Sequence, residues 1–198
     1  AGIASRAKIM PLIVSDGSAV SFNALQNAID YAIENGAEVI NISASSIGSS
    51  GYTEGLTPVF QRAFDKGIVI VVAAGNRDTP GGIGQNLNLI PESPVCNNKG
   101  RRLLLGVAAL NNVDSASDGR TKVSWSSYGS NCVNIAAPGV SITSTVPPAF
   151  QKDRLFYDSV DGSSFSTPIV AGIAAALKSL MPALKNYEIM NRIIATRE

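Results

Sequence analysis

The sequence predicts an α/β fold, with a doubly wound and mostly parallel sheet flanked by helices. Patterns typical of strands and of helices alternate from residue 8 to residue 74, which is typical of parallel strands joined by crossover helices. Residues 68–74 are apolar at every position, as expected for a strand that is covered on both faces at the centre of such a sheet. We expect a single domain over residues 1–198.

The first strand and the first helix are predicted from apolar patterns and from the turn residues that follow them. Residues 8–14 are mostly apolar and lead to a turn at residues 16–18, which favours a strand that reaches the surface. A helix is predicted to begin at Ser21 and to end at residues 35–36, an Asn-Gly pair. Its apolar face contains Phe22, Leu25, Ala28, Ile29, Ala32 and Ile33.

The rest of the chain divides into strands, helices and loops by the same patterns. Further strands are predicted at residues 39–43, 68–74, 103–108 and 134–137, and an exposed hairpin at residues 140–146 and 156–160. Helices are predicted at residues 58–66 and 187–195, and the apolar run at residues 169–180 predicts a further buried helix that the segment around Ser164 opens. No regular structure is predicted at residues 44–52, 77–102 and 111–122, which are rich in polar residues or in Gly and Pro.

Charge and hydropathy exclude two classes of partner. The chain has 16 basic and 15 acidic residues, a net charge of +1, and no basic cluster interleaved with aromatic residues, so nucleic-acid binding has little support. The longest apolar run, residues 68–74, is far too short to cross a bilayer, so we expect no membrane span.

The two cysteines do not indicate a metal site. Cys96 and Cys132 are too few for a zinc site, and the chain contains no histidine that could complete one. A free cysteine packs as a small apolar residue, so we expect two buried thiols rather than a mutual disulfide, which is the alternative.

Ser164 is the first candidate for chemistry. It lies where residues 161–168 lead into a long apolar helix, so its hydroxyl is expected on the first turn, near free backbone N–H groups and the positive end of the helix dipole. That environment suits a nucleophile whose attack creates negative charge. The alternative is that Ser163 or Ser164 only caps the helix. Pro168 is expected in the first turn and is compatible with both interpretations.

The residues around Ser164 resemble a known signature. Residues 162–172, GSSFSTPIVAG, are similar to the segment GTSMATPHVAG of subtilisin-like serine proteases, and the resemblance implies that Ser164 is the nucleophile. Ser163, Phe165, Ser166 and Ile169 differ from the signature, but none of these positions carries the reacting group.

Four more segments resemble the same family, in the same order. Residues 71–76, VVAAGN, are similar to its VAAAGN segment, whose Asn donates a hydrogen bond to the oxyanion; the alternative for Asn76 is an ordinary turn. Residues 39–43, 124–129 and 135–139 resemble its VINMS strand, its FSNYG turn and its APG strand end. The resemblance therefore covers essentially the whole chain.

The resemblance also implies where a peptide or protein substrate binds. An extended substrate would pair as an added strand with Ser43, Ala44 and Ser45. A pocket for the residue before the scissile bond would be lined by Val72, Ala73, Ala74 and Gly75. Glu92 falls where the family has a small residue. It is either a solvated loop carboxylate or a group that shifts preference toward basic residues at the cleaved position.

The general base of this family is missing from the sequence. A serine nucleophile of this kind needs a histidine base and an aspartate that orients it, and the chain has no histidine. The resemblance places both upstream of Ala1, so we interpret the start as truncated and the sheet as incomplete at its N-terminal side. The chain alone is predicted to be inactive. We expect a complementing N-terminal polypeptide carrying Asp and His to fill a gap between residues 8–14 and 39–43. The alternatives are that these two strands pair with each other and close the gap, or that the chain associates with itself.

A catalytically inactive binding or structural protein of the same fold is the alternative function. Retention of both Ser164 and Asn76 favours the enzyme, and the absence of histidine favours the alternative. The resemblance further implies a secreted or extracytoplasmic location and allows bound calcium, for which the sequence assigns no ligands.

Overall fold

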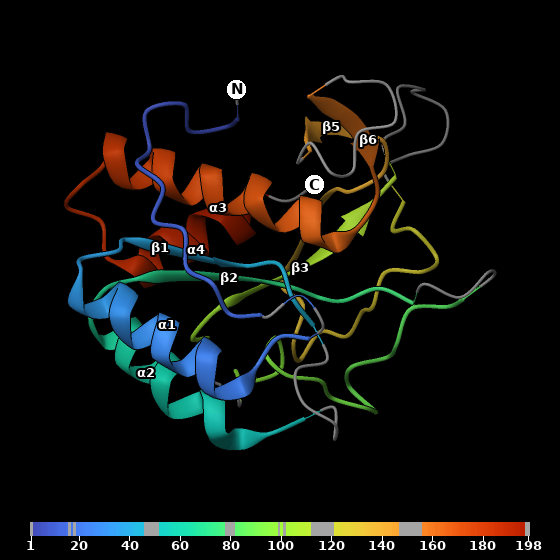
Figure 1. Cartoon of the computed structure of the whole chain (residues 1–198), viewed down its shortest axis with the longest axis horizontal. Helices are drawn as coiled ribbons and strands as arrows, with labels where there is room; N and C mark the ends of the chain where they lie inside the picture. Colours follow the sequence, from blue (N-terminus) through green and yellow to red (C-terminus); the bar gives the residue numbers. More distant parts are fainter. Residues whose placement is uncertain are drawn as a thin grey trace.

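The computed structural model describes residues 2–15, 17, 19–45, 52–77, 82–98, 100, 102–111, 121–146 and 156–196. Four parallel strands form a sheet in the spatial order β1 (Val39–Ile42), β2 (Val69–Ala73), β3 (Leu105–Leu110) and β4 (Ile135–Pro138). Helices α1 and α2 lie on one face of this sheet, and α3 and α4 lie on the other (Figure 1). The predicted doubly wound α/β fold is confirmed.

The first face of the sheet is covered by α1 (Phe22–Glu34) and α2 (Thr57–Asp65), which follows a short 3-10 helix, η1 (Glu54–Leu56). Ser21 caps α1, because its hydroxyl accepts a hydrogen bond from the Ala24 N–H. The apolar stripe predicted for this helix buries Leu25 and Ile29 against α2 and the sheet. The core on this side contains Leu25, Ile29, Val59, Phe60, Ala63, Ile70 and Val72.

The second face is covered by α3 (Ser163–Leu180) and α4 (Asn186–Ala195). Residues of β2 alternate between the two faces, so Val69 and Val71 point to this side while their neighbours point to the other. The core here contains Val69, Val71, Leu105, Val107, Val170, Ala171, Ala174, Ile189, Met190 and Ile193. Both faces of β2 are therefore buried, as its uninterrupted apolar sequence predicts.

The strand predicted at residues 8–14 is wrong. The structure has an irregular segment there, in which Ile9 is 83% and Ile13 is 90% exposed. The segment does not pair with the sheet: among the described residues, β1 is the edge strand, and its one strand partner is β2. An apolar run forms a strand only where a second strand satisfies its backbone hydrogen bonds.

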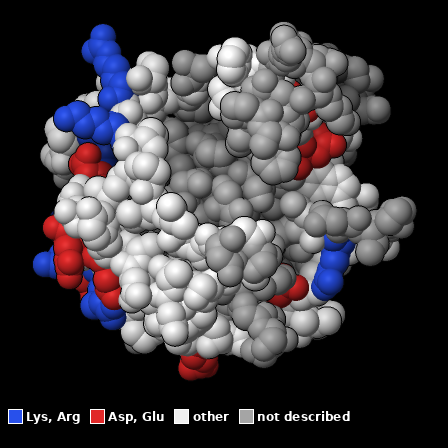
Figure 2. Space-filling view, in the orientation of Figure 1, with Lys and Arg blue, Asp and Glu red and all other residues white. Residues whose placement is uncertain are grey.

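The other predicted strands and helices agree with the described residues. Residues 140–146 and 156–160 contain an antiparallel hairpin of β5 (Ile142–Thr145) and β6 (Tyr157–Val160). The described residues between 77 and 102 form no helix or strand. The predicted loops at residues 44–52 and 111–122 lie largely outside the described residues. No helix among the described residues has the length and hydropathy needed to cross a membrane. Acidic and basic side chains are interspersed on the face in Figure 2 rather than gathered by sign.

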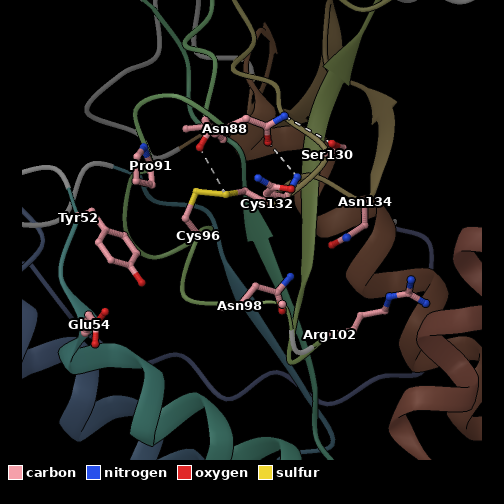
Figure 3. A pocket seen from close by; sticks show the side chains of 13 residues that line it. Tyr52, Glu54, Asn88, Pro91, Cys96, Asn98, Arg102, Ser130, Cys132 and Asn134 are labelled. Carbon is pink, nitrogen blue, oxygen red and sulfur yellow. Dashed lines mark hydrogen bonds between the residues drawn. A yellow bond between two sulfur atoms is a disulfide. The ribbon is translucent and has the colours of Figure 1, made fainter.

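Cys96 and Cys132 form a disulfide, so the expectation of two free thiols is wrong. The two residues meet because the loop before β3 lies alongside the turn before β4: the N–H of Leu87 donates to the Tyr128 carbonyl, and the N–H of Tyr128 donates to the Gln85 carbonyl. Figure 3 shows the disulfide in the wall of a pocket of about 600 Å³. Local sequence could not reveal this pairing, because it depends on contacts between distant segments.

Removal of the disulfide should destabilise the fold. The bond closes a loop of 36 residues, and loss of such a constraint on the unfolded chain costs about 4 kcal/mol in the chain-entropy model. We expect the double variant Cys96→Ser/Cys132→Ser to lower the free energy of unfolding in urea by an amount of this order, and the wild-type chain under reducing conditions to match it. Unchanged unfolding, or two titratable thiols in the folded wild-type chain, would contradict the assignment.

Candidate active site

Ser163 and Ser164 are the first two residues of α3, and the residue before them is a glycine for a structural reason. Gly162 is the N-cap and has φ of +148°, a conformation that residues with a side chain rarely adopt. A Cβ at this position would also lie 3.3 Å from Nδ2 of Asn76. Because the N-cap position is occupied by Gly162, neither Ser163 nor Ser164 caps the helix.

Asn76 bonds directly to the start of α3. It follows the end of β2, and its Oδ1 accepts a hydrogen bond of 3.0 Å from the N–H of Ser163. In return, the hydroxyl of Ser163 accepts a bond of 3.1 Å from the N–H of Gly75. Asn76 therefore satisfies one of the free N–H groups of the helix from a neighbouring strand. With Oδ1 occupied in this way, Nδ2 is the end of the amide that is left to donate to a further group.

A turn at residues 123–128 also contacts Asn76. Ser126 forms an antiparallel bridge with Asn76, and the N–H of Ser127 donates to the Gly75 carbonyl at 3.0 Å. The ammonium group of Lys122 donates to the carbonyls of Val123 and Ser126, at 2.7 and 2.8 Å. Burial lowers the pKa of Lys122 below its ordinary value, because the charged form loses hydration.

Ser43, at the end of β1, forms two hydrogen bonds with Ser164. Its hydroxyl donates to the Ser164 carbonyl at 2.9 Å, and the Ser164 hydroxyl donates to the Ser43 carbonyl at 3.3 Å. The structure thus brings together Ser43, Asn76 and Ser164, which come from three separate segments. A carbonyl oxygen cannot take up a proton as a general base does, so this contact, seen among the described residues, does not activate the Ser164 hydroxyl.

The residues predicted to line a specificity pocket lie beside Asn76. Val72, Ala73, Ala74 and Gly75 are all buried, and Ala44 packs against the first core. The side chains of Ser45 and Glu92 lie against Gly75: a Cβ at Gly75 would be 3.0 Å from Cβ of Ser45 and 3.7 Å from Oε2 of Glu92. Their role in substrate binding stays a prediction.

Glu92 is not freely solvated. Only 12% of its side chain is exposed, and its carboxylate forms an ion pair of 3.7 Å with Arg77, the residue after Asn76. A carboxylate is therefore present next to the residues predicted to bind substrate, with a neighbouring cation that partly balances its charge.

Sequence reasoning did not identify the residues that support this arrangement. Ser126 and Ser127 fall in a segment that was recognised as a motif, but its sequence does not show that they contact the end of β2. Asn41 lies within a predicted strand, and its sequence context does not show that its Nδ2 donates to the Ser43 hydroxyl at 3.0 Å. Among the described residues, no group of three His, Cys, Asp or Glu side chains could hold a metal ion, so we assign no calcium ligands.

The chain is similar in sequence to known proteins over most of its length. The profile of the subtilase family matches residues 1–198. Subtilisin DY of Bacillus licheniformis is 33% identical over 93% of this chain and 58% of its own length. Thermitase of Thermoactinomyces vulgaris is 35% identical over 90% of this chain and 54% of its own length. The chain thus spans little more than half the length of these relatives.

A solved structure shares the fold. The crystal structure of a cold adapted subtilisin-like serine proteinase matches with a TM-score of 0.68 and 24% identity, covering 90% of this chain and 56% of that one.

Ser163 and Ser166, two buried serines of α3, should respond differently to the loss of their hydroxyl groups. Ser163→Ala leaves the buried Gly75 N–H without its acceptor, which should cost about 1–3 kcal/mol of unfolding free energy. The Ser166 hydroxyl is buried and has no hydrogen-bond partner among the described residues, so Ser166→Ala should be neutral or slightly stabilising. Urea unfolding of both variants tests this, and an equal or larger loss in Ser166→Ala would contradict the contact between Ser163 and Gly75.

Proposed function

This chain belongs to the subtilase family, and we propose that it forms the nucleophile-bearing part of a serine endopeptidase that hydrolyses peptide bonds in peptide or protein substrates. The observation that supports this most directly is the hydrogen bond between Asn76 and Ser163. Through this bond the amide side chain of Asn76 lies next to the residue that precedes Ser164. We propose that Asn76 and Ser164 face the same substrate carbonyl.

In the proposed reaction, the Ser164 oxygen attacks the carbonyl carbon of the scissile bond while a histidine takes the hydroxyl proton. Nδ2 of Asn76 and the backbone N–H of Ser164 donate hydrogen bonds to the resulting oxyanion. The C–N bond then breaks, the proton passes from the histidine to the leaving amine, and an ester on Ser164 remains. Water then attacks this ester while the histidine takes its proton, and the histidine returns a proton to the Ser164 oxygen as the carboxylic acid leaves. Ser43, Ala44 and Ser45 pair with the substrate backbone.

The isolated chain is proposed to be inactive because residues 1–198 contain no histidine. Lys178 cannot replace it, since it lies near the far end of α3, roughly 20 Å from Ser164 at about 1.5 Å per residue. Removal of the histidine from a subtilisin, a relative of this chain, lowers turnover by about six orders of magnitude.

We propose that the histidine and aspartate come from a polypeptide segment outside residues 1–198, which also adds a strand to β1. The edge of β1 and the exposed side chains of Ile9 and Ile13 support this. An added strand would form hydrogen bonds with the β1 backbone and would cover the two isoleucine side chains. Self-association is the alternative way to cover them. An extracytoplasmic location, and calcium binding without assigned ligands, remain further proposals from the family resemblance.

Active-site labelling distinguishes the enzyme from a catalytically inactive scaffold. A fluorophosphonate probe should label Ser164 once the upstream segment is restored, because attack on phosphorus needs the same base and oxyanion donors as attack on a carbonyl. Labelling should be absent in Ser164→Ala and in the isolated chain, and intact-mass analysis detects the adduct. A complemented chain that takes up no probe would support the scaffold instead.

Glu92 is proposed to favour substrates with a basic residue before the scissile bond. In the complemented enzyme, Glu92→Ala should lower the ratio of kcat/KM for Arg over Phe substrates by about tenfold or more, because a hydrogen bond to a charged group contributes about 1.5–3 kcal/mol. Glu34→Ala, which removes an exposed carboxylate at the end of α1, serves as the matched control. An unchanged ratio in Glu92→Ala would discard this role.

A further inference from the structure

Pro168 removes a hydrogen bond from the candidate nucleophile. The expectation that this proline lies in the first turn is wrong: α3 begins at Ser163, so Pro168 is its sixth residue and lies in the helix interior. The N–H of a residue at this position normally bonds to the carbonyl four residues earlier, which here is the carbonyl of Ser164. Proline has no N–H, so that carbonyl loses its partner within the helix.

Ser43 supplies the missing donor. Its hydroxyl lies 2.9 Å from the Ser164 carbonyl oxygen, although the two residues are 121 positions apart in the sequence. Asn41 fixes the direction of this bond, because its Nδ2 donates to the same hydroxyl oxygen at 3.0 Å. A hydroxyl has one proton, so the Ser43 hydroxyl accepts from Asn41 and donates to Ser164.

We propose that Ser43 is a positioning residue for the nucleophile, because it replaces the hydrogen bond that Pro168 removes and thereby ties the first turns of α3 to the end of β1. This inference rests on the proposed function, in which Ser164 attacks the substrate. The bond from the Ser164 hydroxyl to the Ser43 carbonyl, at 3.3 Å, must break when a base takes over that proton. The bond from the Ser43 hydroxyl to the Ser164 carbonyl involves no reacting atom and persists through the reaction.

In this proposed arrangement Ser43 contacts both the substrate and the nucleophile. Its backbone belongs to the segment proposed to pair with substrate, and its side chain holds the backbone of Ser164. The attacking oxygen and the scissile bond are thereby held at a fixed spacing by a single residue, which is the kind of alignment on which the rate of attack depends.

A double-mutant cycle with Pro168 tests the hydrogen bond in the isolated chain. In the chain that keeps Pro168, Ser43→Ala should lower the free energy of unfolding, because the Ser164 carbonyl then loses the donor that Ser43 supplies. In Pro168→Ala, residue 168 regains an N–H that can serve this carbonyl, so the added effect of Ser43→Ala should be much smaller. Equal effects of Ser43→Ala in both backgrounds would overturn the proposal. This measurement needs no histidine and does not depend on the proposed function.

The positioning role is tested by the rate of fluorophosphonate labelling with the upstream segment restored. Ser43→Ala should slow the labelling step about tenfold, with less change in the probe concentration that half-saturates the rate. Adding Pro168→Ala to Ser43→Ala should restore much of the labelling rate. Ser43→Thr keeps the hydroxyl and should label at nearly the wild-type rate. Wild-type labelling by Ser43→Ala would overturn the role. If no variant labels but the stability cycle shows coupling, the proposed function fails and the hydrogen bond is still supported.

Discussion

The contact between the end of β2 and the first residues of α3 is the interaction on which the candidate site depends. Two hydrogen bonds form it, from the Ser163 N–H to Asn76 and from the Gly75 N–H to the Ser163 hydroxyl. Each bond satisfies a backbone N–H that would otherwise be left without a partner at a buried helix start or strand end. The same contact places Asn76 beside Ser164, so the requirement to satisfy these groups also assembles the pair proposed for catalysis.

Small residues make this contact possible, because the segments approach one another too closely for side chains. Gly75 has φ of +94°, and Ser45 and Glu92 lie directly over it. At Gly139, whose carbonyl accepts the N–H of Gly162 at 2.8 Å, a Cβ would lie 2.4 Å from the Ser166 hydroxyl and 2.6 Å from the Cβ of Ala109. These positions favour glycine for reasons of space and backbone conformation, whatever activity the site has.

Local sequence predicted most of the fold because its signals are local. The strand at residues 68–74 and the helix after Ser21 follow from periodicity and end residues, which need no knowledge of distant parts of the chain. The strand at residues 8–14 and the pairing of Cys96 with Cys132 were predicted wrongly, because each depends on which distant segment lies alongside. Pro168 was misplaced by one turn, since the exact start of a helix is set by the contacts of its first residues.

The candidate site could be predicted only in part for the same reason. The resemblance of residues 71–76 and 162–172 to one family indicated Asn76 and Ser164, and the structure places the two segments in contact. The resemblance of residues 39–43 and 124–129 to the same family does not show the hydrogen bonds of Ser43 and Asn41 or the support from the turn at residues 123–128, because the contacts with Ser164 and Asn76 join distant segments. They become visible only when the distances between side chains are known.

The most direct test of the central claim is a crystal structure of the complemented protein with Ser164 phosphonylated. If Asn76 and the Ser164 backbone form one oxyanion site, the phosphoryl oxygen will lie about 2.7–3.1 Å from both Nδ2 of Asn76 and the N atom of Ser164. A phosphoryl oxygen that contacts neither atom, or an adduct on a different residue, would contradict the account.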